Sequence, residues 1–557
     1  MKQQTAYAQV SLTQTPQTEP IPGSNQVANN GGGFGWETSA EHQLLRFLIL
    51  GSEGNSYYVS SKELTKDNAV NVLKIMQGPH GEKAVQTIVD VSDSGRAFKN
   101  EPAIFALAIA AKLGTKETKQ AAWRALSKVC RIPTHLYSFC TYVKKLGGWS
   151  RGTRKAVEYW FNMKTPSNLA FQLSKYGNRN GWSVRDVLLV SHTKPKDTVI
   201  DAVLAAVTGN AEVTEDGFQI KHKEVRNYKV TKPGDTEEME KARAYLHACE
   251  QVKTVSQSEM LKLIEAYRLP MEVIPTERRD AGVYELMLEN YGATALLRNL
   301  ANLTRHKVIA PGKWDNNAKV IERLTSEKEL RAGRIHPLSI LVAKRTYAQG
   351  KGEKGTNTWV PVGDVVEALE KAFYLSFGTI EPANKIFMLA LDVSGSMAWN
   401  PMKNLAGMTP REASAVMAMT TFRTETKVLV KAFSTGLMDV PITRDQTLET
   451  VTNILSQMPM SGTNCSAPIR YALEEGIKVD TFVIYTDNET NHHGEIHPAQ
   501  LLKQYRNKVY EGAKLVVCAM ERANKTIADP QDAGMMDIVG FDTATPNVIT
   551  GFARGDF

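Results

Sequence analysis

The sequence predicts two folded domains: an array of paired α-helices and, after it, a doubly wound α/β domain. Three observations support this prediction. The chain has 557 residues, too many for one ordinary hydrophobic core. From about residue 41 to 378, apolar residues recur every three or four positions in short segments, and Gly or Pro marks many of the joints. After residue 380, apolar β-rich runs alternate with helical segments.

The first 37 residues have a different composition from the rest. They are rich in Gln, Thr, Pro, Asn and Gly and end in NNGGGFGWE. Such a segment buries too little apolar surface to offset the entropy lost on ordering. We therefore expect residues 1–37 to form a flexible or loosely docked N-terminal arm.

The central part, residues 38–380, is predicted to be a stack of helical hairpins. Typical segments are EPAIFALAIAAKLG, TKQAAWRALSKVC and DTVIDAVLAAVTG. Stacked helical pairs build a solenoid with one long curved surface. Because no exact repeat is legible, the pattern supports only an irregular, HEAT-like pairing.

The last part, residues 381–557, is predicted to contain a parallel sheet covered by helices on both faces. The expected strands are IFMLALD, KVLVKAF, TFVIYTD and AKLVVCAM, and helices are expected near 409–422, 444–456, 467–476 and 498–510. Strands that are apolar on both faces and separated by helices are typical of such sheets.

Charge is distributed unevenly between these parts. The net charge of the chain is +8. Residues 381–557 contain 16 Lys and Arg against 20 Asp and Glu, a net charge of −4, which leaves +12 for residues 1–380. This asymmetry indicates a polyanionic partner for the helical part.

Composition also restricts the cellular setting. The five cysteines are odd in number and contain no CxxC motif, so neither a disulfide framework nor a zinc site is indicated. No apolar run approaches the roughly 20 residues of a membrane span, and the polar start lacks the apolar core of a signal peptide. We expect a cytoplasmic monomer without membrane association.

The stretch LALDVSGSM places a carboxylate and two hydroxyls where the first predicted strand ends. These are Asp392, Ser394 and Ser396; Thr463 lies in a later loop, and Asp487 follows the strand TFVIYTD. In a doubly wound sheet, ligands bind beyond the carboxyl ends of the strands. Carboxylate and hydroxyl oxygens suit Mg²⁺ or another divalent cation. The alternative is that Asp392 and the serines only cap turns.

This combination resembles the von Willebrand factor A-type domain and its metal-ion-dependent adhesion site. The DxSxS element, the loop threonine and the later aspartate occur in the family's chain order. The resemblance implies that these five side chains hold the cation. One departure is Asn488, which follows Asp487 where adhesion domains usually have glycine.

The segment SKYGNRNGWSVRDVLLVSHTKP, residues 174–195, is the most informative part of the helical region. Lys175 is expected to end one helix and Arg179 to lie in a loop. Ser183 with Asp186 resembles an N-capping arrangement for the next helix. Free N–H groups at that helix start would favour a phosphate.

On that second helix, Arg185 and His192 are seven residues apart, about two turns, and are therefore expected to share one face. The alternative is a solvated surface helix with a histidine in its last turn.

Several blocks in order resemble the Ro (SS-A) autoantigen family. They are KVCRIPTHL, GSEGNSYY, KYGNRNGWS, LLRNLANLT, RIHP and TDNET. Members of this family join a TROVE module, a ring of HEAT-like helical repeats, to a von Willebrand A-type domain. The resemblance implies a ribonucleoprotein scaffold for RNA quality control or processing. It also implies that this scaffold binds small noncoding Y RNAs on the outer ring surface and single-stranded 3′ ends of misfolded RNA in the central hole.

The resemblance also assigns roles to particular residues. Lys175, Arg179 and His192 match the family's contacts with Y RNA. Arg131 and Arg154 are weaker candidates for the ring surface, and a structural salt bridge is an equal alternative for both. Some family relatives imply that an exoribonuclease or another protein docks on the A-type domain.

Three other motifs suggest activities that their surroundings do not favour. GWSRG at 148–152 has the spacing of a hydrolase nucleophile elbow around Ser150, but its flanks are predicted helices. GKGEKG at 350–355 matches a dinucleotide-binding pattern but follows a helix. His492, His493 and His497 are consistent with an exposed loop or a transition-metal site.

The sequence therefore favours a non-enzymatic RNA-binding scaffold. A metal-dependent protein-interaction platform without RNA, similar to chelatase subunits, is the second hypothesis. A hydrolase using Ser150 or the histidine loop is the third.

Overall fold

The helical array follows the predicted hairpin pattern. The computed structural model describes residues 14–50, 69–97, 99–215, 217–220, 237–352, 356–378, 380–399, 408–521, 525–540 and 542–556. The helices of the array are α2 (Ala40–Leu50), α3 (Val70–Gln77), α4 (Gly81–Asp93), α5 (Glu101–Leu113), α6 (Lys116–Val129), α7 (Pro133–Lys145), α8 (Arg151–Asn162), α9 (Pro166–Lys175), α10 (Val184–Ser191), α11 (Thr198–Val207), α12 (Glu237–Gln251), α13 (Gln257–Tyr267), α14 (Ala281–Asn290), α15 (Ala293–Arg305), α16 (Trp314–Leu324), α17 (Glu327–Ala332), α18 (Pro337–Ala348) and α19 (Gly363–Leu375). Short hairpins, β3 (Asn178–Arg179) with β4 (Trp182–Ser183) and β5 (Ala211–Val213) with β6 (Phe218–Ile220), interrupt the series.

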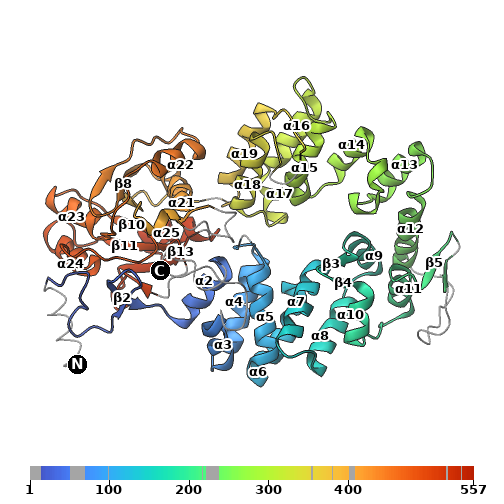
Figure 1. The fold of residues 1–557 in the computed structure, drawn as a ribbon, viewed down its shortest axis with the longest axis horizontal. Coiled ribbons are helices and arrows are strands. Elements are labelled where there is room, and N and C mark those ends of the chain that lie inside the picture. The colour runs from blue at the N-terminus through green and yellow to red at the C-terminus, as the bar shows by residue number, and fades with distance from the viewer. Residues whose placement is uncertain are drawn as a thin grey trace.

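Local sequence sets many of the helix starts. Thr115, Thr165 and Asp197 each accept a hydrogen bond from a backbone N–H in the first turn, which satisfies a donor that the helix itself leaves unpaired. Consecutive helices then pack as neighbours, for example α5 on α6 and α18 on α19. Figure 1 shows the helices running out along one side of the molecule to α12 and returning along the other to α19.

The two ends of the array meet. Arg334, just before α18, donates from Nη2 to the Asp93 carboxylate at 2.7 Å, although 241 residues separate them in sequence. Gly95 lies so close to Arg334 that a Cβ on this glycine would come within 2.9 Å of the Arg334 Cβ. Gly95 also has a φ of +70°, which favours glycine. The array therefore closes on itself as a ring.

The second domain is a six-stranded sheet with helices on both faces. Its strands are β7 (Ile386–Asp392), β8 (Lys427–Phe433), β9 (Leu437–Asp439), β10 (Thr481–Thr486), β11 (Lys514–Ala519) and β13 (Met535–Val539). Its helices are α20 (Ser396–Trp399), α21 (Pro410–Thr424), α22 (Leu448–Ser456), α23 (Ala467–Glu474), α24 (Pro498–Lys508) and α25 (Thr545–Arg554). The strand order is β13-β11-β10-β7-β8-β9, and every pairing is parallel except that of β9, an antiparallel edge strand.

This order creates a topological switch point between β7 and β10. The chain leaves β7 toward β8 on one side and returns to β10 on the other, with Val483 paired to Leu389. In open α/β sheets a crevice forms at such a point, beyond the carboxyl ends of the two strands. Asp392 ends β7 and Asp487 directly follows β10, so both lie at this edge.

The sheet domain lies against both the first and the last helices of the array (Figure 1). On one side, the fully buried Arg46 of α2 donates to both Asp537 carboxylate oxygens of β13, at 2.7 and 2.6 Å. On the other side, the Glu370 carboxylate of α19 accepts from the backbone N–H of Leu448 at 3.1 Å. The closed ring and the sheet domain are thus joined by buried or half-buried polar contacts.

Residues 14–37 differ from the flexible arm that their composition predicted. They lie against the sheet domain, where β2 (Phe34–Glu37) pairs with both β1 (Val27–Ala28) and β12 (Lys525–Thr526). Trp36 is 2% exposed and belongs to the hydrophobic core on one face of the large sheet. Residues 1–13, the rest of the predicted arm, lie outside the described residues. The partner domain supplies the apolar surface that the segment lacks by itself.

Polar contacts also hold the arm on the sheet domain. The side chain of Gln17 is fully buried and donates to Asn464 Oδ1 at 2.9 Å and to Ser466 Oγ at 3.1 Å. Gly33 approaches the Thr490 carbonyl so closely that a Cβ would come within 1.9 Å of its oxygen. This close approach requires glycine, because any side chain would displace the backbone.

None of the helices in the part of the chain that the structure describes is long and apolar enough to cross a membrane.

Candidate functional site: a cation centre and a basic helical surface

Three loops converge at the switch point of the sheet. Gly395, inside the DxSxS element, donates its backbone N–H to the Ser461 carbonyl at 3.3 Å. Two residues further on, the Thr463 carbonyl accepts from the Asn491 N–H at 3.0 Å, which ties the same loop to the segment after β10. The structure thus brings together the three segments that carry the five predicted cation ligands.

All five of these side chains are buried, with exposed fractions of 5% or less. Asp392 Oδ1 accepts from the Ser394 N–H at 2.9 Å, and the Ser394 and Ser396 hydroxyls are 3.1 Å apart. Thr486, which was not predicted, donates from Oγ1 to Asp392 Oδ2 at 2.6 Å. Thr486 is the last residue of the fully buried strand β10, directly before Asp487, and only its proximity to Asp392 in space reveals its role.

The two carboxylates disfavour each other's charge. Burial, followed by the charge of Asp487, raises the pKa of Asp392 to about 7. Burial also raises the pKa of Asp487, although a hydrogen bond from Ser396 opposes the increase. Among the described residues, no partner hydrogen-bonds Asp487 Oδ2. The guanidinium of Arg411 is nearby but donates to backbone carbonyls, including that of Ser394 at 3.4 Å.

This donor set fits a hard divalent cation. Two carboxylates and several hydroxyls are the oxygen ligands that Mg²⁺ or Mn²⁺ prefers, and Asp487 Oδ2 has no other use in the described structure. Within the described residues, no three His, Cys, Asp or Glu side chains are arranged to hold one ion. An ion at this edge would therefore depend on hydroxyl and water oxygens as well as on Asp392 and Asp487.

Asn488 stands where adhesion domains usually have glycine, and its backbone has a conformation that asparagine can also adopt. Its φ is +68°, in the left-handed region that glycine adopts most easily and that asparagine tolerates better than most residues. Asparagine can therefore stand here without rearranging the loop. Its side chain also accepts from the Ile527 N–H at 3.4 Å.

Four of the predicted RNA-contacting residues, Lys175, Arg179, Arg185 and His192, lie on or next to α9, the β3–β4 hairpin and α10. Lys175 ends α9 as expected, and its ammonium lies 5.6 Å from the ring centre of Phe171 and 5.5 Å from that of Tyr176. Arg179 is exposed in the hairpin, and Asn180 and Gly181 form its two-residue turn with φ values of 55° and 73°. The loop expected at Arg179 is therefore a tight β-hairpin, and Asn-Gly is a strong signal for such a turn.

The start of α10 differs in part from expectation. Ser183 and Asp186 do form a capping box, in which Ser183 Oγ accepts from the Asp186 N–H at 3.2 Å and Asp186 accepts from the Ser183 N–H at 2.8 Å. Two N–H groups and a carboxylate are therefore already engaged at this helix start. Fewer free N–H groups than expected therefore remain here for a phosphate, so the neighbouring side chains must supply most of the positive charge.

His192 lies just beyond α10 and not in its last turn. The helix ends at Ser191, and His192 caps it with a φ of +51°. Arg185 is exposed in the first turn of the helix, so the expected shared helical face does not exist. Both side chains are nevertheless exposed at opposite ends of the same short helix.

Arg131 and Arg154 are less accessible. The Arg131 guanidinium donates to the Ser92 carbonyl and hydroxyl, both at 2.9 Å, which gives it a structural role between α4 and α7. Arg154 is half-buried in α8, and its Nε has no hydrogen-bond partner among the described residues.

Additional basic residues lie next to the hairpin. Lys144 and Lys145, both exposed at the end of α7, line a groove together with Asn180 and Trp182. Trp182 Nε1 donates to Thr141 Oγ1 at 2.9 Å and so fixes the hairpin on α7. The adjacent lysines were visible in the sequence, but only the folded chain places them beside residues 178–182.

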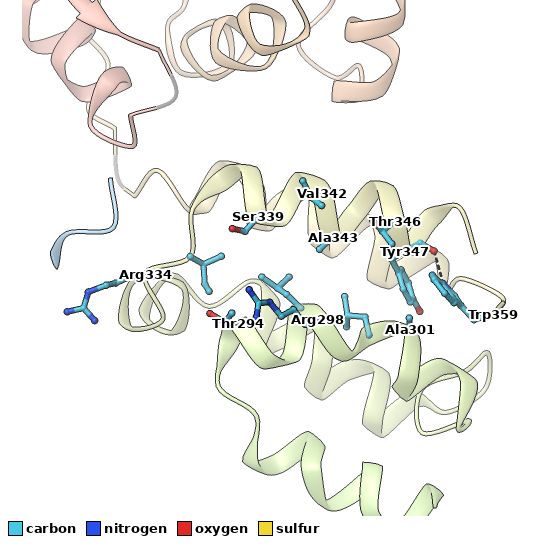
Figure 2. A pocket seen from close by; sticks show the side chains of 13 residues that line it. Thr294, Arg298, Ala301, Arg334, Ser339, Val342, Ala343, Thr346, Tyr347 and Trp359 are labelled. Atoms are coloured by element: carbon cyan, nitrogen blue, oxygen red, sulfur yellow. Dashed lines mark hydrogen bonds between the residues drawn. The ribbon is translucent and has the colours of Figure 1, made fainter. Parts of the chain in front are cut away.

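A separate pocket of about 430 Å³ lies between α15 and α18. Its walls are largely aliphatic, with Leu297 and Val342 among them, and Trp359 donates from Nε1 to the Tyr347 carbonyl at 2.8 Å at one end. Figure 2 shows Arg298 between the two helices. This pocket is distinct from the sheet edge, and none of the described residues that line it is acidic.

Ser150 acts as a helix cap. Its Oγ accepts from the Thr153 N–H at 3.2 Å at the start of α8, and the preceding element is helix α7, where a nucleophile elbow needs a strand. The dinucleotide-like motif also follows a helix, α18, and its residues 353–355 lie outside the described residues.

Replacing Ser150 with alanine is therefore expected to lower the free energy of unfolding by about 1 kcal/mol, the usual cost of losing an N-cap. Urea denaturation followed by circular dichroism measures this change. Ser150→Thr, which keeps the acceptor, should retain most of the stability. An alanine variant as stable as the wild type would contradict the capping role.

The predicted histidine loop contacts the arm. His493 Nδ1 and Thr18 Oγ1 are 3.1 Å apart, and His497 Nε2 and the Glu19 carbonyl are 2.8 Å apart. His497 is buried, so the expectation of an exposed loop is wrong for this residue.

Comparisons with known proteins agree with this architecture. The TROVE domain model matches residues 27–271 and 271–346, and the Ro60 vWA domain model matches residues 386–553. The chain belongs to the Ro60 family. It is 40% identical over 542 residues to the RNA-binding protein RO60 of Deinococcus radiodurans, covering 97% of each chain. It is also 34% identical to the RNA-binding protein RO60 of Caenorhabditis elegans, covering 95% of this chain and 90% of the relative.

A solved Ro60-family structure has the same fold. The crystal structure of the Deinococcus radiodurans RO (RSR) protein superposes with a TM-score of 0.67 at 38% sequence identity. The match covers 93% of this chain and 100% of the solved one. The predicted ring of helical repeats followed by a von Willebrand A-type domain is thereby confirmed.

Proposed function

We propose that this protein is an RNA-binding scaffold of a ribonucleoprotein. The observation that carries the proposal is the group of basic residues around the β3–β4 hairpin and α10: Lys175, Arg179, Arg185 and His192. Lys144 and Lys145 line the groove beside the same hairpin. Two relatives that align along nearly the whole chain are named RNA-binding proteins, which supports the same reading.

The chemistry of this surface suits structured RNA. Protein contacts to double-stranded RNA are mostly to phosphates and 2′-hydroxyls and depend on shape, so a rigid arrangement of cations is sufficient. The hairpin that carries Arg179 is fixed on α7 by Trp182, which holds the charges in a defined array. We assign a small noncoding, Y-like RNA to this outer surface and single-stranded 3′ ends of misfolded RNA to the interior of the ring. The role is RNA quality control or processing.

We further propose that the sheet domain holds a divalent cation through Asp392, Ser394, Ser396, Thr463 and Asp487. When bound, such an ion would supply a Lewis-acidic contact for the carboxylate of a protein partner. The chain's own residues position the ligands: Thr486 and the Ser394 N–H orient Asp392, and the Ser461 carbonyl holds Gly395.

The RNA proposal is tested by a salt series. Fluorescence anisotropy with a labelled stem-loop RNA that carries a single-stranded 3′ end should show affinity falling linearly on a log–log plot. The slope is expected to be about −0.7 to −0.9 per neutralised phosphate. Combined replacement of Lys175, Arg179 and Arg185 by glutamine should weaken binding and make the slope shallower by about 2.

A charge-matched control separates a local contact from a general charge effect. Lys427, Lys478 and Lys508 are exposed on the acidic sheet domain, and replacing them by glutamine changes the net charge by the same amount. This control should leave the slope unchanged. Equal weakening in both triple variants, or a binding curve insensitive to salt, would contradict the proposed surface.

A further inference from the structure

Glu521 is a buried carboxylate beside the cation centre that the five-residue motif does not include. It follows β11, which is the neighbour of β10 in the sheet, and Thr486 pairs with Ala519. The Met520 N–H donates to the Thr486 carbonyl at 2.9 Å, so the two chains leave the sheet side by side. Asp487 and Glu521 therefore emerge from adjacent strand ends.

Within the part of the chain that the structure describes, the Glu521 carboxylate lacks the hydrogen bonds that buried charges normally have. It is 0% exposed, and neither of its oxygens has a hydrogen-bond partner among the described residues. Burying an ionised carboxylate without a partner is strongly unfavourable, because the charge loses its hydration and gains nothing in return. Burial, and then the charges of Asp487 and Glu489, raise the pKa of Glu521 well above its usual range.

Two other buried glutamates show how this protein ordinarily satisfies such groups. Glu425 is also 0% exposed, but its oxygens accept from the N–H groups of Ala383 at 2.6 Å and Asn384 at 3.1 Å. Glu489 accepts from the Gly31 N–H at 2.9 Å and from the Asn30 side chain at 3.1 Å, both in the arm. Glu521 differs from both because the described protein offers it no donor.

The orphan oxygens are concentrated on one side of the cation centre. Asp487 Oδ2 and both Glu521 oxygens are buried and have no hydrogen-bond partner among the described residues; they follow neighbouring strands, and their charges interact. Oxygens that only accept can be satisfied here by a cation or by water molecules ordered around one. Because no three acidic side chains are arranged to hold one ion among the described residues, Glu521 is better suited to act through a bridging water.

We propose that Glu521 is a further positioning residue of the cation centre, which holds the water shell of the divalent ion and balances its charge. The inference rests on the proposed binding of that ion at Asp392 and Asp487. It extends the centre from two strand ends to three, β7, β10 and β11.

The test is calorimetric titration of the full-length protein with Mn²⁺ and with Mg²⁺. Glu521→Gln keeps the size of the side chain and removes its charge. Loss of a residue that orients a metal's ligands or waters typically weakens binding 10- to 100-fold. We expect at least about a tenfold weaker Mn²⁺ affinity and a smaller metal-induced increase in Tm. The matched control, Glu425→Gln, removes an equally buried carboxylate and should leave Mn²⁺ affinity unchanged.

The possible outcomes distinguish this inference from the proposed ion itself. If Asp392→Asn abolishes Mn²⁺ binding while Glu521→Gln binds like the wild type, Glu521 has no role in the centre. If the wild type binds neither ion, both the cation centre and the role of Glu521 are wrong. Glu521→Ala is the second variant, and in it the same loss of affinity with an intact circular dichroism spectrum supports the inference.

Discussion

Replacing Trp36 with alanine is expected to lower the free energy of unfolding of the sheet domain by about 3–5 kcal/mol, the usual cost of removing a large buried aromatic side chain. Trp36 is among the largest fully buried side chains of the described protein and packs in the core with Ile21. Its strand also pairs with β12. Urea unfolding, with hydrogen exchange measured on peptides from β11 and β13, reports the loss in this domain.

Trp314 provides the matched control. It is 73% exposed at the start of α16. Its replacement by alanine therefore removes the same kind of side chain, but from a position in contact with solvent. Substitutions at such sites usually change stability by no more than about 0.5 kcal/mol. Similar effects of Trp36→Ala and Trp314→Ala would show that the N-terminal arm is only loosely docked.

The alternation of helix and strand was predictable because it depends on the local spacing of apolar residues. The strands IFMLALD and KVLVKAF are β7 and β8 with the expected residues, and the helix expected near 409–422 is α21, Pro410–Thr424. Each is long and apolar enough to determine its own conformation. The short edge strand β9 and the last strand β13 were missed. β9 has only three residues, and both depend on neighbours for their pairing.

Residues 14–37 were predicted to be flexible or loosely docked because composition indicates only how much apolar surface a segment can bury by itself. The run NNGGGFG resembles a linker, yet Asn29 donates to the Thr490 carbonyl at 2.8 Å, and Gly33 is required by a close backbone approach to the same residue. These partners are more than 450 residues away in the sequence. Segments that fold against a distant surface obtain their stability from that surface, which no local pattern encodes.

The candidate sites were predictable to the extent that chemistry is local. The spacing of Asp392, Ser394 and Ser396 places three side-chain oxygens that can bind a cation close together at the end of β7. The parallel strands bring Asp487 to the same edge of the sheet. Helix ends were less certain: His192 fell outside α10 because the helix ended one residue earlier. Thr486 and Glu521 could not be singled out, since their importance arises from neighbours in the sheet.

Replacing Asp392 with asparagine is expected to abolish divalent-cation binding without destabilising the metal-free protein. Asparagine has nearly the same shape, and its oxygen can still accept from the Ser394 N–H, while its amide can donate to the Thr486 hydroxyl. The substitution also removes a buried charge that Asp487 repels. The metal-free variant should therefore be as stable as the wild type or more stable.

The contrast appears when the ion is added. At a concentration 100 times its Kd, an ion that binds only the folded state stabilises the wild type by about 2.7 kcal/mol. The Asp392→Asn variant should gain none of this, as measured by thermal or urea unfolding with and without Mn²⁺. A second comparison uses Ca²⁺, which prefers more ligands at longer distances than this small donor set offers and should stabilise the wild type less. If Asp392→Asn and the wild type respond equally to Mn²⁺, the ion binds elsewhere. The converging loops would then serve only to cap the strands of the sheet.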